Sequence, residues 1–147
     1  MPTLARVFIK TALLYLAAGI TLGGALLIDK AYPFSPALLE LLPLHFQWLL
    51  LGWTLQLALG MVYWIMPRTD LVRKKSWLGW LSYALLNVAL AAFTIAELLP
   101  ALATAAAPRW LEGMAALCLA ATPIAFTLHI WPRVRKLVLT GLTPKQG

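Results

Sequence analysis

Four long apolar runs are the feature of this chain that most restricts its fold. They extend from Val7 to Ile28, from Leu44 to Met66, from Trp77 to Leu99 and from Trp110 to Trp131. Each run has the length, about 20 residues, that an α-helix needs to cross the hydrocarbon core of a bilayer. Helices also pair every backbone polar group, which hydrocarbon demands. We therefore predict an all-α integral membrane protein, an antiparallel four-helix transmembrane bundle.

The composition leaves no room for a soluble domain of ordinary size. Hydrophobic residues make up 62% of the 147 positions, and charged residues make up only 12%. The four runs and their short connections use nearly the whole chain, so residues 1–147 are predicted to form a single transmembrane domain. This composition argues against a soluble enzyme, a disordered chain and a disulfide-stapled secreted module. Cys118, the sole cysteine, cannot form an internal disulfide.

The basic residues are divided unequally between the two predicted membrane sides. The side with both termini and the connection between the second and third runs receives ten of the twelve: Arg6, Lys10, Arg68, Arg73, Lys74, Lys75, Arg133, Arg135, Lys136 and Lys145. The other side receives Lys30 and Arg109, together with four of the five acidic residues. The positive-inside rule then places both termini in the cytoplasm. Topology explains the net charge of +7, so we expect the lipid bilayer as partner and no nucleic acid.

The second run carries a stripe of small and polar residues. At 100° per residue, one helix face collects His45, Leu49, Gly52, Gln56, Gly60 and Tyr63. Such a face does not favour lipid, so it is predicted to contact protein, a cavity or a cofactor. One interpretation is close helix packing through the glycines, with Gln56 bonded to a neighbour. The other is a cofactor edge resting on the glycines, with His45 as a heme-iron ligand.

The same residues resemble a known family. The spacing of His45, Gly52, Gly60 and Pro67, with aromatic residues before the proline, is similar to the second helix of the catalytic subunit of heme-copper oxidases. The resemblance is greatest to the nitric oxide reductase and cbb3-type branches and to small four-helix bacterial membrane proteins related to that subunit. The first run, with its Gly19-xxx-Gly23 pattern, would match the first helix of the family.

The resemblance implies that His45 ligates a low-spin, b-type heme near the outer face. The cofactor site expected on this basis consists of His45, Gly52, Gln56, Gly60 and Met114, with the histidine as the iron ligand. The family's catalytic subunits have about twelve helices and carry their remaining heme and copper ligands in later helices. This chain has four runs, so we expect no catalytic centre.

The second histidine cannot complete the same heme within one chain. His129 lies near the inner end of the fourth run and His45 near the outer end of the second, a depth difference of roughly 25 Å. Met114 lies at about the depth of His45, and it is either a second axial ligand or a core methionine. His129 itself is predicted to be an interfacial histidine.

Two further groups of polar residues allow more than one interpretation. Glu40, Glu97 and Glu112 lie toward the outer side with His45, as a metal cluster or as carboxylates that pair with Arg109 or water. Gln56 and Asn87 both fall near mid-membrane. Two amides at one depth on consecutive helices are predicted to bond each other, because hydrocarbon offers no other partner.

The function expected from these observations is that of a small respiratory-type membrane protein. It would bind the heme and transfer electrons, or serve as an accessory or assembly subunit of a terminal oxidase or nitric oxide reductase. A larger respiratory complex or a homodimer is the expected assembly. The alternatives are a cofactor-free packing subunit and a small transporter or channel, the latter resting on Gln56 and Asn87.

Overall fold

The structure, a computed structural model, describes residues 1–66, 76–103 and 106–140, and within these ranges it contains helices and no strand. Its helical segments, in chain order, are α1 (Thr3–Ala31), α2 (Pro36–Leu39), α3 (Leu42–Gln47), the π-helix η1 (Trp48–Leu55), α4 (Gln56–Ile65), α6 (Ser76–Ala103) and α7 (Arg109–Thr140).

Four helical stretches in the described part of the chain are long and apolar enough to cross a membrane, as the sequence predicts. They are Thr3–Ala31, Pro36–Ile65, Ser76–Ala101 and Arg109–Pro132. Two of them, Thr3–Ala31 and Pro36–Ile65, begin several residues before the predicted apolar runs, because the residues that flank each run continue the same helix.

Prolines lie inside both α6 and α7. Pro100 is within α6, and Pro132 is within α7. A proline removes one backbone hydrogen bond, but near the end of a membrane-spanning helix water or a side chain can satisfy the freed carbonyl. Pro67, which belongs to the family-like spacing of the second run, lies outside the described residues.

A buried acidic side chain organises the loop after α1. One carboxylate oxygen of Asp29 accepts hydrogen bonds from the backbone N–H of Phe34, at 3.0 Å, and of Ser35, at 2.9 Å. Asp29 is only 2% exposed. These bonds turn the chain back, and Pro36 then occupies the first turn of α2, where its missing N–H costs no hydrogen bond.

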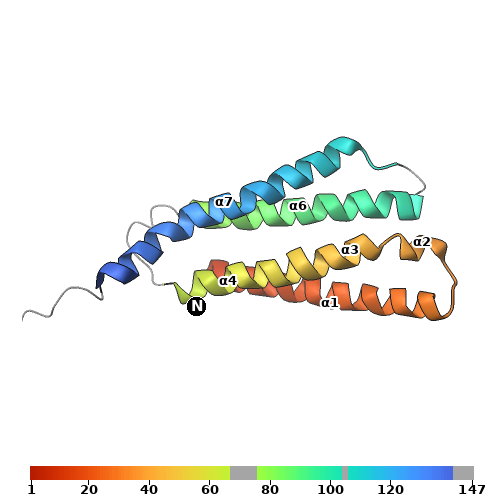
Figure 1. Cartoon of the computed structure of the whole chain (residues 1–147), viewed down its shortest axis with the longest axis horizontal. Helices are drawn as coiled ribbons and strands as arrows, with labels where there is room; N and C mark the ends of the chain where they lie inside the picture. The colour runs from red at the N-terminus through yellow and green to blue at the C-terminus, as the bar shows by residue number, and fades with distance from the viewer. Residues whose placement is uncertain (67–75, 104–105, 141–147) are drawn as a thin grey trace, which may run out of the picture.

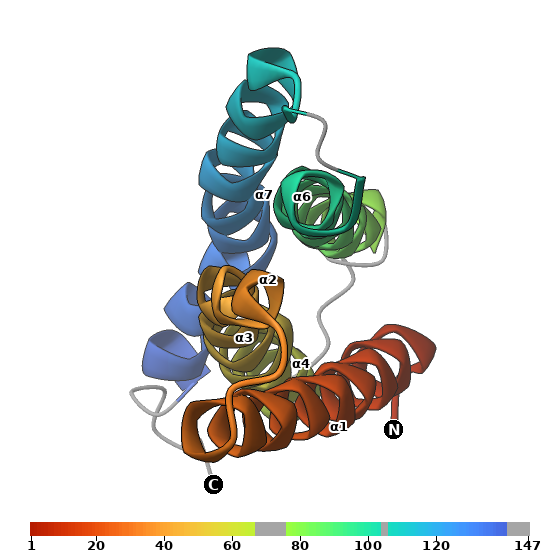
Figure 2. The ribbon, with the colours of Figure 1, turned by 90° about the vertical axis from the view of Figure 1, so that its right-hand side faces the viewer.

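The helices form two pairs, as Figures 1 and 2 show. Helix α1 packs along α3, η1 and α4, and α6 packs along α7, whereas contacts between the two pairs are sparse. The start of α1, the end of α4 and the start of α6 lie at one end of the molecule, which we call the proximal end (Figure 1). The end of α1, α2 and the start of α7 lie at the other, the distal end.

The two pairs join through an apolar cluster at the proximal end. Its buried members come from α1, α4 and α7, and they are Leu4, Ala5, Phe8, Tyr63, Phe126 and Ile130. Two side-chain hydrogen bonds link the pairs farther along. Thr11 Oγ1 lies 2.9 Å from the Tyr83 hydroxyl, and Trp48 Nε1 donates to Thr94 Oγ1 at 3.0 Å.

Small residues allow α6 and α7 to approach each other toward the distal end. A second buried cluster there contains Ala92, Ala96, Leu111 and Ala115. Close packing of small side chains supplies the attraction between helices where lipid removes the hydrophobic driving force. Each pair therefore has its own interface, and the proximal cluster joins them.

Candidate functional site

We call the second apolar stretch, Pro36–Ile65, the second membrane helix. Its stripe of small and polar residues faces α1. Leu49 lies against Gly19, Gly52 against Tyr15, and Gly60 against Phe8. The numbers of the contacting residues fall along α1 as they rise along the second helix. Gln56 and Tyr63 on the same stripe are also buried. Helix packing, the first of the two interpretations of this stripe, is therefore present in the structure.

Gly52 and Gly60 permit this packing because a side chain at either position would collide with α1. A Cβ atom at Gly52 would lie 2.5 Å from Cγ of Tyr15, and one at Gly60 would lie 2.8 Å from Cβ of Phe8. Side chains of α1 thus fill the space beside both glycines. Contact of Gly52, Gln56 and Gly60 with a cofactor stays a prediction.

A π-helix interrupts the second membrane helix, a feature that the sequence analysis did not anticipate. Segment η1 follows α3 directly, and the Thr54 hydroxyl donates to the Leu49 carbonyl five residues earlier, at 2.9 Å. Short π segments inside α-helices often accompany functional sites. Here the segment begins three residues after His45.

His45 is held in one orientation by the backbone of α1. Its Nδ1 atom lies 2.9 Å from the carbonyl oxygen of Gly19. A carbonyl only accepts hydrogen bonds, so in the neutral ring Nδ1 carries the proton and Nε2 keeps its lone pair. The imidazole lies over Gly23, where an added Cβ would be 2.5 Å from its Cε1 atom. The Gly19 carbonyl and the missing side chain of Gly23 therefore position this ring.

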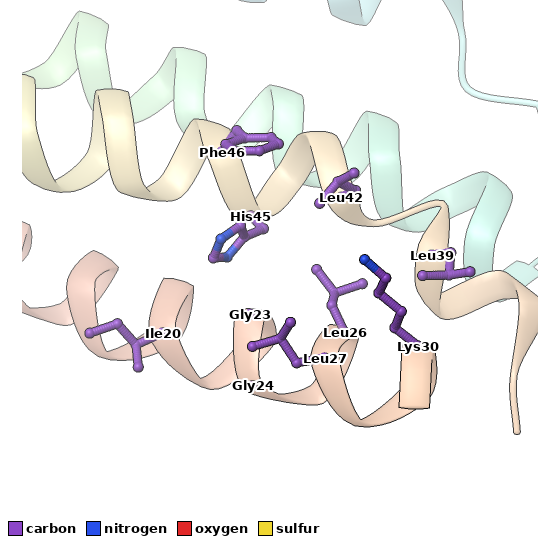
Figure 3. A pocket seen from close by; sticks show the side chains of 10 residues that line it. All are labelled: Ile20, Gly23, Gly24, Leu26, Leu27, Lys30, Leu39, Leu42, His45 and Phe46. Carbon is purple, nitrogen blue, oxygen red and sulfur yellow. The ribbon is translucent and has the colours of Figure 1, made fainter. Parts of the chain in front are cut away.

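His45 also lines a cavity of about 570 Å³ near the distal end, between α1 and the start of the second membrane helix (Figure 3). We call it the His45 cavity. The ring points from α3 toward Gly23, and Lys30 extends from the last turn of α1 toward α3. The other lining residues are glycine or apolar: Ile20, Gly23, Gly24, Leu26, Leu27, Leu39, Leu42 and Phe46.

Sequence reasoning identified His45 but missed the rest of this cavity. Most of the lining residues are ordinary apolar residues of a membrane helix, and no pattern distinguishes them. Two signals were present: Lys30 is one of only two basic residues on its predicted side, and Gly24 directly follows the Gly19-xxx-Gly23 pattern. Together they mark a charged, side-chain-poor patch at the end of α1.

The predicted bond between Gln56 and Asn87 is not formed. Asn87 donates from Nδ2 to the Tyr83 carbonyl of its own helix at 2.9 Å. Gln56 is fully buried against α1, where Nε2 lies 3.5 Å from the Phe8 carbonyl and Oε1 has no hydrogen-bond partner among the described residues. The prediction was wrong because equal depth does not bring two faces together, and Gln56 belongs to the face that packs on α1.

Met114 and the acidic residues do not build a site around His45. Met114 is 37% exposed on α7 and does not line the His45 cavity. Within the described ranges, no group of three or more His, Cys, Asp or Glu residues is arranged to hold a metal ion. Glu40, Glu97 and Glu112 therefore form no cluster with His45, and a role of Met114 as second axial ligand stays a prediction.

The two histidines lie at opposite ends of α1, as the sequence predicts. His45 sits over Gly23, whereas Nε2 of His129 approaches Gly79 beside Leu4. Leu4 and Gly23 are separated by roughly 28 Å of helix. His129, which we expected at the membrane interface, is 1% exposed and stacks on Tyr63 with ring centroids 5.5 Å apart. Its burial follows from its place in the junction between the helix pairs.

In comparisons with known proteins, no family model matches this chain, and no curated protein or solved structure matches it either.

Proposed function

We propose that this protein is a small multi-pass membrane protein that binds a b-type heme through His45. The charge distribution supports an antiparallel bundle in a bacterial inner membrane, with both termini and the proximal end toward the cytoplasm. The His45 cavity then lies near the outer face. In this proposal the protein transfers electrons, or serves as an accessory or assembly subunit of a terminal oxidase or nitric oxide reductase, and it is not catalytic alone.

The observation that carries the proposal is the contact between His45 Nδ1 and the Gly19 carbonyl. Histidines that ligate metals characteristically donate their other ring N–H to a carbonyl or carboxylate, which fixes the tautomer and the ring orientation. The same contact leaves Nε2 of His45 with the lone pair that heme iron requires. Gly23 leaves room for the ring, so the donor and its support are both built into the helix pair.

The surroundings of His45 also fit a porphyrin. The cavity volume of about 570 Å³ falls within the range of small-molecule sites, and its lining is largely apolar. The side chains that would hold the group are His45, as iron ligand, and the apolar residues of α1 and α3 around it. A bound heme supplies a one-electron redox centre whose potential depends on ligation, burial and nearby charge.

The position of the cavity favours an assembly larger than one chain. Leu27, Leu39 and Phe46 on its lining are exposed, so the cavity lies at the lateral surface of the helix pair. A second axial ligand can therefore reach the iron from a partner subunit or from His45 of a second copy. Met114 as ligand, or five-coordinate iron, are the other outcomes of the proposal.

A cofactor-free accessory subunit is the second candidate function. Its support is the packing of Gly52 and Gly60 against α1, since the helix pair closes there without a cofactor. The transporter interpretation rested on an amide pair that the structure does not contain. The two candidates differ in whether the purified protein is coloured.

An optical spectrum of the purified protein distinguishes the two candidates. We expect a reduced-minus-oxidised difference spectrum with a sharp α-band and a Soret band in protein produced with ample heme supply. Gly23→Ala should weaken both bands, because the added methyl group displaces the His45 ring. A colourless protein that co-purifies with an oxidase would favour the cofactor-free subunit.

A further inference from the structure

The His45 cavity contains one positive charge in an otherwise nearly apolar lining. Apart from His45, Lys30 is the only residue with a polar side chain among those that line it. Lys30 is seven residues after Gly23, so the two lie on the same face of α1, on the order of 10 Å apart along its axis. The ammonium group therefore lies distal to the imidazole that sits over Gly23, and Figure 3 shows Lys30 reaching across toward Leu42.

No acidic side chain in residues 1–66, 76–103 and 106–140 neutralises Lys30. The adjacent carboxylate, Asp29, is buried and accepts the N–H groups of Phe34 and Ser35 in the loop. Among the described residues, Lys30 takes part in no ion pair. The charge is thus available to a ligand, and at the edge of a membrane its attraction for an anion is stronger than in bulk water.

We propose that Lys30 is the anion-recognition residue of the His45 cavity and binds a carboxylate of the ligand. This inference rests on the proposed function, in which the ligand is heme, an apolar ring with two propionate groups on one edge. Iron at His45 and a propionate at Lys30 would orient the ring along α1, with its charged edge distal and its apolar body against Ile20, Leu26 and Leu27. The site therefore selects an apolar molecule with an acidic end.

Charge on the ligand can be removed separately from charge on the protein. We would titrate the protein in nanodiscs of uncharged lipid with heme and with heme dimethyl ester, which lacks both carboxylates, and subtract the signal of His45→Ala discs. Lys30→Gln should weaken heme binding about tenfold, the loss of one charge-assisted hydrogen bond, and leave the ester unaffected. Lys30→Arg should retain heme binding. Lys10→Gln, a change at the other end of α1, is the matched control.

The results separate this inference from the proposed function. Equal affinity of the wild-type protein for heme and ester, or equal weakening of both by Lys30→Gln, would overturn the anion role, while heme binding through His45 would stand. Equal weakening of heme and ester binding by Lys30→Gln would mean that Lys30 only stabilises the end of α1 through the helix dipole. Native mass spectra test whether Lys30 binds a lipid headgroup instead. If Lys30→Gln leaves heme affinity unchanged but loses the anionic phospholipid that the wild-type protein retains, Lys30 binds lipid and the anion role toward heme is overturned. Absence of a Soret shift with either ligand would reject both proposals.

Discussion

Gln56 shows how a single buried amide is constrained by its surroundings. Its Oε1 atom is buried and has no hydrogen-bond partner in the described part of the chain, and its Nε2 contact with the Phe8 carbonyl is long, at 3.5 Å. A buried polar atom without a partner costs about 1–3 kcal/mol. The carbonyl of Phe8 belongs to the regular backbone of α1 and does not depend on the glutamine.

Replacing Gln56 by Leu should therefore raise the free energy of unfolding by about 1 kcal/mol, because it removes the unpaired oxygen. Asn87→Leu is the comparison, since its amide bonds only to its own helix. The effects of the two changes should add within about 0.5 kcal/mol in a double-mutant cycle, as expected for side chains without contact. Steric trapping or SDS unfolding would measure them. A larger coupling energy would mean that the two amides do meet.

For single residues, the sequence indicated which side chains have distinctive chemistry, but it did not indicate which neighbours these side chains contact. His45 is recognisable because imidazole is rare in a membrane helix and shares a stripe with two glycines. Its Nδ1 contact with Gly19 was not foreseeable, since a backbone carbonyl leaves no mark in the sequence. The sequence showed Lys30 only as one of two basic residues on its predicted membrane side, not as part of a cavity.

The pairing of α1 with the second membrane helix depends on glycines at defined points. Gly52 lies against Tyr15 with no room for a methyl group, whereas a Cβ at Gly113 on α7 would meet nothing within 4 Å. Both positions lie inside helical segments. They therefore form a matched pair for the same substitution in tight and open surroundings.

We expect Gly52→Ala to destabilise the protein by about 1–3 kcal/mol, the usual effect of forcing extra volume into a packed interface. Gly113→Ala should instead be neutral or stabilising by up to about 1 kcal/mol, because alanine restricts the unfolded chain. Thermal unfolding in detergent measures whether each substitution lowers or raises the stability of the protein. A stabilising Gly52→Ala would show that Tyr15 does not pack on this glycine.

The apolar runs located all four helices that are long and apolar enough to cross a membrane, but not the exact ends or the regularity of these helices. Composition determines which segments can lie in hydrocarbon, so the centres of the predicted runs agree with the centres of the observed helices. Prolines near the interface did not end α6 or α7. The π-helix η1 had no recognisable sequence signal, because the hydrophobic pattern of Trp48–Leu55 is compatible with an ordinary α-helix.

The whole molecule is two helix pairs joined at the proximal end, and the predicted orientation would place that end in the cytoplasm. Cysteine labelling of intact cells tests that orientation, in a Cys118→Ala background that removes the only native thiol. A membrane-impermeant reagent should reach Ser35→Cys in the distal loop and miss Ser76→Cys at the proximal end, because the positive-inside rule places the latter in the cytoplasm. Labelling of Ser76→Cys alone would reverse the topology and place the His45 cavity on the cytoplasmic side.

The sequence could not reveal which helices pair, for a physical reason. In lipid both the exposed and the buried faces are apolar, so hydrophobicity does not mark the interface. The stripe of the second helix was the exception, because its glycines and Gln56 indicated a protein contact. The junction around Tyr63 and His129 depends on the mutual tilt of the two pairs, which residue spacing does not encode.

The proposed function depends on His45 as a heme-iron ligand, and the heme content per chain after replacement of that residue measures this ligation. We expect His45→Gly to lose the Soret band and added imidazole to restore it, because free imidazole can occupy the vacated space over Gly23. His129→Phe, which keeps an aromatic ring beside Tyr63 at the other end of α1, should retain the heme content of the wild type. Wild-type protein that lacks heme, or a His45→Gly variant that keeps it without imidazole, would show that His45 does not ligate heme iron.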